Sequence, residues 1–247
     1  METGALSITS LLPREQERFQ KFFRYAFLMK GQTWYGGSPF LKSRLGRPGY
    51  GIDQDLFIAE WNRRLAGCAD TTPELRISRV VLDWFLHPGF QRKRIGRALV
   101  RSCMDRARQL GAELMHVCAQ EEDPFSRDFL KELGFEEVRC FLDFETGLVP
   151  PRGMGEAKAS IPVTHFRAGD EPLLATVQNR VFSGSWGFCP NSPDDIRYYI
   201  RLTESKWQDI LTIKQEERVA GYLWCHRTMS ASASRIRQRW RIHMFGI

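Results

Sequence analysis

The chain has 247 residues, of which 43% are hydrophobic and 26% charged, and its formal net charge is +7. This composition is typical of a folded globular protein and excludes a disordered or fibrous chain. The sequence lacks an apolar run long enough to span a membrane and a secretory leader, so we expect neither a membrane protein nor a secreted one. The six cysteines include no CxxC pair and the five histidines no ligand spacing, which favours free thiols in the cytoplasm and no metal site.

The first half of the chain predicts a mixed α/β unit. Apolar residues at helical spacing alternate with β-type runs, and Gly- and Pro-rich stretches separate them. The nearly continuous apolar run Arg79–Leu86 indicates a strand that is buried on both faces. The predicted elements are a helix over Arg14–Phe27, loops over 31–40 and 46–53, a hairpin over 55–70, a strand over Arg79–Leu86, a helix from about Arg97 to Leu110, a strand over 113–119, a helix over 123–135 and a strand over 136–145.

The second half repeats the pattern of the first. Residues 149–162 are rich in Gly, Pro, Ala and Ser without a hydrophobic period, so we predict a linker there. Both halves contain a hairpin whose second strand carries an apolar-Ala-Gly sequence, Leu65-Ala66-Gly67 and Val219-Ala220-Gly221. We therefore predict an internal duplication, with domains over 1–148 and 163–247. The predicted elements of the second half are a strand over 163–170, helices over 171–182 and 191–202, the latter capped by Ser192, a hairpin over 209–226 and a strand over 241–247.

A basic loop connects the predicted strand Arg79–Leu86 to the helix that follows it. A strand that leads through a short loop into a helix N-terminus presents unpaired main-chain N–H groups to an anion, and the helix dipole adds to the attraction. Taken alone, this loop is compatible with a diphosphate site and equally with a solvated basic turn. It spans Gln91–Ala98 and contains the cationic residues Arg92, Lys93, Arg94 and Arg97.

Two motifs resemble those of a known family. PGFQRKRIGRAL resembles the acyl-CoA pyrophosphate loop of the GNAT superfamily of N-acetyltransferases, whose pattern is Q/R-x-x-G/A-x-G/A. Gln91 and Gly96 match this pattern, and Arg94 stands in place of its first small residue. DPFSRDFLKELGF is similar to the family's later helix and matches it at Phe129, Gly134 and Phe135.

The second half resembles part of the tandem-domain acetyltransferases of the mycothiol-synthase-like type. The resemblance is carried by FSGSWGFCPNSPDDIRYYI and by RIHMFGI, which is similar to the strand before their second CoA loop. It implies that residues 163–247 are a partial second domain, truncated before its own cofactor loop.

The resemblance implies a GNAT-like fold, an α/β fold with an α+β mixed sheet, and acetyl-CoA or another acyl-CoA as co-substrate. In this family the central strand separates from its parallel neighbour, and the pantetheine chain pairs with the exposed strand. Carried over to this sequence, Phe85 and Leu86 line the pantetheine, and Asp123 takes the place of an asparagine near the start of the later helix. The implied pyrophosphate residues are Gln91, Arg92, Lys93, Arg94, Ile95, Gly96, Arg97 and Ala98.

Catalysis in this family requires a base that takes the amine proton and often uses an acid for the leaving thiolate. Asp83 is the only carboxylate inside the predicted strand and His87 follows its end, so both are candidates for the base. Asp83 could instead be a paired structural acid, and His87 a surface histidine. The sequence departs from the family at Leu130, which occupies the position of the tyrosine that often serves as the acid and cannot donate a proton.

Two further segments have two interpretations each. SGSWGFCP (183–190) carries Trp186 and Phe188, which could line an acceptor pocket or anchor the loop on the core. RIRQRWR (Arg235–Arg241) could contact RNA or single-stranded DNA through phosphates and stacked bases, or form a solvated hairpin loop.

From these residues we predict a cytoplasmic acyl-CoA-dependent N-acyltransferase that transfers an acetyl group to a small-molecule amine by direct attack. Two alternatives stay open: a catalytically degenerate CoA-binding half of a tandem acetyltransferase, and a basic nucleic-acid-associated protein. The main prediction includes no nucleic acid, membrane or metal partner. An exposed strand at 241–247 could pair with another chain.

Overall fold

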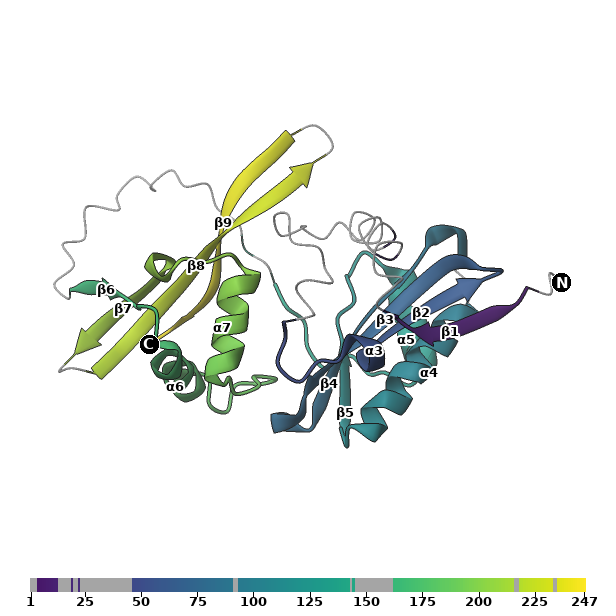
Figure 1. Ribbon diagram of the computed structural model, residues 1–247, viewed down its shortest axis with the longest axis horizontal. Helices are drawn as coiled ribbons and strands as arrows, with labels where there is room; N and C mark the ends of the chain where they lie inside the picture. Colours follow the sequence, from purple (N-terminus) through teal and green to yellow (C-terminus); the bar gives the residue numbers. More distant parts are fainter. Residues whose placement is uncertain are drawn as a thin grey trace.

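The computed structural model of the chain describes residues 4–12, 19, 22, 46–90, 93–142, 144, 162–215, 218–232 and 235–247. These residues form two β-sheets, each with its own helices, one from each half of the sequence (Figure 1). Within the described ranges no helix combines the length and apolar character that crossing a bilayer requires.

The first sheet is mixed, as predicted. Its five strands lie in chain order, the first four antiparallel to one another and the fifth parallel to the fourth. Every residue of the fourth strand is buried or half-buried, which confirms the burial expected from its apolar run. The strands are β1 (Leu6–Ser10), β2 (Leu56–Trp61), β3 (Arg64–Glu74), β4 (Arg79–Leu86) and β5 (Leu114–Val117).

Helices α4 (Lys93–Gln109) and α5 (Pro124–Glu132) pack on one face of this sheet. Ile95 and Leu99 of α4 are fully buried there. The chain leaves α4 through Gly111 at φ +72°, which confirms the predicted glycine after the helix. The helix begins at Lys93 rather than at the predicted Arg97, so part of the predicted loop is the first helical turn.

A second apolar cluster lies on the opposite face of the sheet. Phe19 and Phe22, both helical, pack there against Phe85 of β4. They belong to the predicted helix Arg14–Phe27, whose other residues lie outside the described ranges, as does the predicted loop 31–40. Next to this cluster, the short helix α3 (Ile52–Asp55) buries Asp55, which accepts a hydrogen bond from Arg106 Nε of α4 at 2.7 Å.

The predicted strand at 136–145 is wrong, because residues 136–142 form no strand. Val138, Phe141 and Leu142 are 65, 70 and 76% exposed, so this segment does not lie on the sheet. Phe141 and Arg139 of this segment lie beside the ring of Trp186 in the second half. Composition alone does not decide whether a run pairs as a strand, because strand formation depends on the packing of its side chains against neighbours.

The second sheet is antiparallel throughout, in the order β6-β7-β8-β9. Helices α6 (Glu171–Val181) and α7 (Pro193–Leu202) cover one face of it. Ser192 caps α7 and forms a capping box with Asp195, as the sequence predicts. The strands are β6 (Val163–His165), β7 (Ile210–Gln215), β8 (Arg218–Ser232) and β9 (Arg235–Gly246). The predicted linker 149–162 lies outside the described residues except for Pro162.

The two predicted hairpins share an irregularity in their pairing. In β2–β3 the register shifts just before Gly67, and in β7–β8 it shifts just before Gly221. Ala66 and Ala220 are thus the additional residues of two equivalent β-bulges. The second sheet repeats the antiparallel strand order and the bulge of the first.

Gly96 has a packing role that the sequence interpretation did not assign. A Cβ atom at this position would lie 2.8 Å from a ring carbon of Phe129 and 3.3 Å from a methyl carbon of Leu86. Only glycine therefore allows α4 to approach α5 and the end of β4 this closely.

We expect Gly96→Ala to destabilise the protein by about 1–3 kcal/mol, because the added methyl group overpacks the contact with Phe129. Helix propensity alone would increase the free energy of unfolding of the alanine variant by about 1 kcal/mol. A decrease in this free energy would therefore identify overpacking as the cause. Urea unfolding measures it. Gly51→Ala is the matched control, because its Cβ would meet only atoms at 3.4 Å or beyond. A stabilised Gly96→Ala variant would contradict the packing role.

Candidate active site

Strand β4 extends beyond the end of its parallel partner. The β4–β5 pairing runs from Arg79–Leu114 to Leu82–Val117, and β4 then continues through Asp83–Leu86. On one side these last residues pair with β3; on the other, no strand in the described part of the chain pairs with them. A strand edge of this kind presents main-chain N–H and C=O groups to which an extended chain can bind.

The side chains of the two predicted pantetheine residues are buried. Phe85 and Leu86 are each 7% exposed and belong to the apolar clusters on opposite faces of the sheet. A ligand that followed this edge of β4 would therefore meet their main-chain groups.

The unpaired edge leads directly to the N-terminus of α4. After Leu86 the chain makes one turn of 3-10 helix, Pro88–Phe90, and α4 starts at Lys93. The N–H groups of the first turn, Lys93–Gly96, have no acceptor within the helix, and no acidic residue lies in this turn. The dipole of a 17-residue helix makes this end attractive for an anion. Gln91 and Arg92 lie outside the described residues.

Two of the predicted cationic residues are engaged by neighbouring elements. The guanidinium of Arg94 lies 5.1 Å from the ring centre of Trp61 in β2. Arg97 Nη2 lies 3.1 Å from Glu132 of α5 at the surface. Ile95 is fully buried and Ala98 is half-buried, and both side chains are apolar. These two residues could therefore bind a polar ligand only through their main-chain groups. Of the part of this helix end that the structure describes, the main-chain N–H groups are the donors that no described side chain engages.

Asp83 occupies the first position of the unpaired edge, directly opposite Asp70 of β3. Directly opposed residues of neighbouring strands share a face, so the two side chains lie on the same face of the sheet. Asp70 is 2% exposed and accepts a hydrogen bond from the hydroxyl of Thr72 at 3.4 Å, whereas Asp83 is half-buried. Sequence reasoning missed Asp70, because only the strand register brings it opposite Asp83.

His87 follows the end of β4, and its ring is held by the turn after it. The N–H of Gly89 donates to Nδ1 of His87 at 3.0 Å, and the ring packs edge-on against Phe90. A neutral imidazole that accepts at Nδ1 carries its proton on Nε2. His87 would have to give up the bond from Gly89 before it could take up a proton as a base.

The two residues of α5 that depart from the family pattern have structural roles. Asp123 is the N-cap and accepts a hydrogen bond from the main-chain N–H of Ser126 at 3.0 Å. Leu130 is 5% exposed and lies in the core. The carboxylate of Asp123 thus caps the helix, and the position of the family's acid is occupied by a buried apolar side chain.

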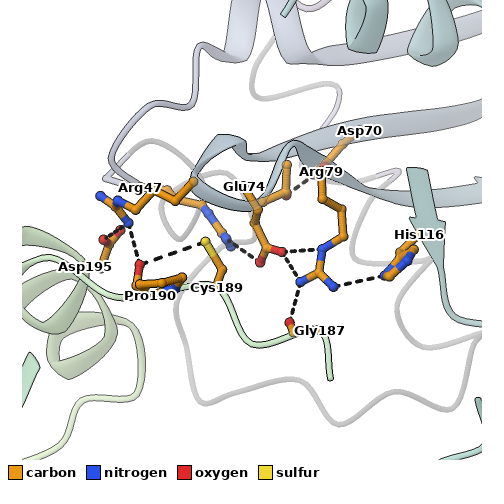
Figure 2. A network of polar contacts seen from close by, with 11 residues as sticks. Arg47, Asp70, Glu74, Arg79, His116, Gly187, Cys189, Pro190 and Asp195 are labelled. Carbon is orange, nitrogen blue, oxygen red and sulfur yellow. Dashed lines mark hydrogen bonds and ion pairs between the residues drawn. The ribbon is translucent and has the colours of Figure 1, made fainter. Parts of the chain in front are cut away.

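A loop of the second half contacts the other end of β4 (Figure 2). Arg79, the first residue of β4, is buried and donates to Glu74 through Nε at 2.8 Å and to the main-chain oxygen of Gly187 through Nη2 at 2.7 Å. Its Nη1 lies 3.0 Å from Nδ1 of His116. Burial, followed by the positive charge of Arg79, lowers the pKa of His116, which favours the neutral imidazole that accepts this bond.

The same loop is anchored by an aromatic stack. The rings of Trp186 and His116 lie 5.1 Å apart and are inclined by only 8°. Beside this loop, Arg76 Nη1 donates to the main-chain oxygen of Pro190 and to Asp195 Oδ2, both at 2.8 Å. The anchoring interpretation of Trp186 is therefore the one that its contacts support.

Two cavities lie between the halves, with volumes of about 420 and about 470 Å³. The larger one is lined by Arg79 and His116 of the first half and by Trp186 of the second. Both lie near the start of β4, whereas the unpaired edge and the N-terminus of α4 lie at its far end. Among the described residues, no three His, Cys, Asp or Glu side chains cluster in a way that would hold a metal ion.

Comparison with known proteins places these features in a family context. Residues 27–135 match the family model of the Acetyltransferase (GNAT) family. No curated protein matches the sequence.

Several solved structures resemble the chain. A GCN5-related N-acetyltransferase from Sphaerobacter thermophilus aligns over 98% of this chain and 76% of its own, with a TM-score of 0.62 and 14% identity. A GCN5-related N-acetyltransferase from Anabaena variabilis aligns over 98% of this chain and 58% of its own, with a TM-score of 0.62 and 10% identity. Both alignments span the two sheets. At these low identities they show a similarity of fold alone. The chain therefore has the fold of the GNAT acetyltransferases, and residues 27–135 carry the part that matches that family's model.

Proposed function

We propose that the chain is an acyl-CoA-dependent N-acyltransferase that transfers an acetyl group from acetyl-CoA to a small-molecule amine. The observation that carries the proposal is the unpaired edge Asp83–Leu86, which runs into the N-terminus of α4. Coenzyme A combines an extended chain of amides with a diphosphate, and the two parts of the site suit these two parts of the molecule. The family-model match supports the same chemistry.

The main chain would hold most of the ligand. The N–H and C=O groups of Asp83–Leu86 would pair with the pantetheine amides, and the N–H groups of Lys93–Gly96 would hold the pyrophosphate. With the diphosphate at α4, the acyl end of the ligand would lie toward the start of β4, beside Asp83. This orientation brings the reacting group next to the Asp70–Asp83 pair.

The chemistry requires the chain to accept one proton from the amine. Acyl-CoA supplies a thioester whose carbonyl carbon forms a bond to the amine nitrogen while the C–S bond breaks. We assign to Asp83 the acceptance of the amine proton, directly or through a water, because it is a half-buried carboxylate at the first position beyond the β4–β5 pairing. Asp70 would assist as a second negative charge that attracts an ammonium group to this place. The leaving thiol then takes its proton from solvent, because Leu130 cannot supply one.

The organisation predicted from sequence is part of the proposal. We infer a domain over 1–148, a linker over 149–162 and a second copy over 163–247, and the shared strand order and bulges support this division. The stack of Trp186 on His116 would hold this second copy against the first. We retain the cytoplasmic location, which six free cysteines support.

A second candidate function is a CoA-binding half without catalysis. The buried Leu130 at the position of the family's acid favours it. Binding of acetyl-CoA without thiol release over a panel of primary amines would identify this alternative.

The main-chain cradle can be tested with a proline at the first position of α4. Lys93→Pro removes one N–H donor at a place where a helix tolerates proline, whereas Lys93→Ala keeps that donor. A hydrogen bond to a charged group contributes about 1.5–3 kcal/mol, so we expect the proline variant to bind acetyl-CoA roughly tenfold or more weakly than the alanine variant. Calorimetric titration measures both affinities. Equal affinities would show that this end of the helix does not bind the diphosphate.

The proposed base can be tested with an isosteric change. Asp83→Asn keeps the shape of the side chain and cannot accept a proton, so we expect kcat to fall by about 100-fold or more. The affinity for acetyl-CoA should stay within about twofold, because that binding uses the main chain. Thiol release from acetyl-CoA with a responsive amine measures kcat. Asp128→Asn on the exposed side of α5 is the control. Unchanged turnover in Asp83→Asn would remove Asp83 from the mechanism.

A further inference from the structure

The second sheet has one covered face and one open face. Ile210, Tyr222 and Trp224 are at most 5% exposed and pack with α6 and α7 on one side of the sheet (Figure 1). Successive residues of a strand point to opposite faces, and the residues that alternate with these three are not part of that core. We use the name open face for the second side of the sheet, defined by six apolar residues: Val163, Leu211, Ile213, Leu223, Ile242 and Phe245.

The open face corresponds to the face of the first sheet on which α4 packs. The β2–β3 and β7–β8 hairpins have the same register and the same bulge, so Ala59 corresponds to Ile213 and Ala69 to Leu223. In the first half α4 packs against β2, β3 and β4, and both alanines are at most 1% exposed. In the second half the same two positions are only half-buried.

Corresponding residues of β4 and β9 differ strongly in exposure. Leu82 and Trp84 of β4 are 2 and 6% exposed, because α4 and α5 pack on their face of the sheet. Ile242 and Phe245 pair with β8 as those two residues pair with β3, but they are 58 and 63% exposed. The first half thus shows what kind of element covers this face, namely a helix with one apolar stripe.

The open face is positively charged at both of its ends. Arg218 and Arg227 of β8 lie there, on the same side of the sheet as Leu223, and both are exposed. At about 3.3 Å per residue, the two arginines are about 30 Å apart along the strand. Among the described strand residues that point to this side, none is acidic. The open face therefore combines an apolar centre with a positive charge at each end.

We propose that the open face binds an acidic amphipathic helix of a partner protein, in the position that α4 has in the first half. An amphipathic helix binds an apolar surface through residues at i, i+3, i+4 and i+7, which form one stripe. A helix of about 20 residues is about 30 Å long, so acidic residues near its two ends would meet Arg218 and Arg227. This docking is independent of acyl transfer, because the second sheet contains no part of the proposed CoA site.

A second copy of the chain fits the open face less well than such a helix. Packing of two open faces would bring arginines against arginines, and the net charge of +7 on each chain adds to the repulsion. Four strands are about 19 Å wide and the six residues of β7 about 20 Å long, so the face covers roughly 400 Å². A stable interface takes about 800 Å² from each partner, so the face suits one helix better than a second sheet.

A lipid surface is also a poorer match. β6 and β9 are the edge strands of the sheet, and no described strand pairs with their outer main-chain groups. Insertion of the open face into hydrocarbon would remove water from these groups without supplying hydrogen-bond partners. A helix would cover the apolar side chains and leave both edges in water.

The experiment measures the binding of a designed helix to the full chain by fluorescence anisotropy. The probe is a fluorescent peptide of about 20 residues, with leucine at i, i+3, i+4 and i+7 spacing and glutamate at both ends. We expect a dissociation constant of about 10 µM, because the buried area is small. A peptide of the same composition with its leucines spread around the helix should bind roughly tenfold or more weakly. A peptide with lysine in place of glutamate should bind about fivefold more weakly at low salt.

Variants of the chain locate the binding. Ile242→Ser/Phe245→Ser removes exposed apolar side chains and should weaken binding of the glutamate peptide by roughly tenfold or more. The matched control Val138→Ser/Leu173→Ser changes residues that are 65 and 42% exposed elsewhere on the surface, and it should leave binding unchanged. Arg218→Glu should abolish the preference for glutamate over lysine. Circular dichroism and thermal melting show that each variant is folded.

Four results would overturn the proposal. The first is no binding of the glutamate peptide, and the second is equal binding of the peptide with spread leucines or by the Ile242→Ser/Phe245→Ser variant. The third is a dimer of the chain that this double variant converts to a monomer, which would assign the open face to a second copy. The fourth is binding to phosphatidylserine vesicles that the double variant abolishes, with no binding of the peptide, which would assign the face to a lipid surface.

Discussion

The end of the β4–β5 pairing at Leu82 and Val117 is the constraint on which the candidate site depends. Because β5 stops there, the last residues of β4 keep one unpaired edge while β3 still holds them on the other. The buried contact at Gly96 brings α4 close to the end of that edge. Strand edge and helix end thus become two parts of one surface, and the proposed binding of coenzyme A depends on both.

Elements with strong local patterns could be predicted from the sequence. The apolar run of β4, the capping box of α7 and the glycine after α4 were predicted correctly, because propensity and capping act over a few residues. Features that depend on distant neighbours could not be predicted. Asp70 faces Asp83 only through the strand register, and Gly96 is required by Phe129, which lies in another helix.

The incorrect predictions concern segments whose structure depends on more than local composition. Residues 136–142 have the composition of a strand, but they are exposed and form none. The interpretation of Arg235–Arg241 as a solvated loop is also wrong, because these residues lie in β9 and pair with β8. The same hairpin and bulge occur in both halves: in the first half the hairpin supports the candidate active site, and in the second β8 and β9 stay paired beyond the end of the β7–β8 pairing.

The position of Arg79 has a consequence for how the molecule unfolds. Its guanidinium is buried and is satisfied jointly by Glu74 and His116 of the first half and by the carbonyl of Gly187 in the second. Separation of the halves would leave a charged donor without one of its acceptors, which is costly for a buried group. Melting of one half would therefore weaken the other through this contact, although each half has its own core.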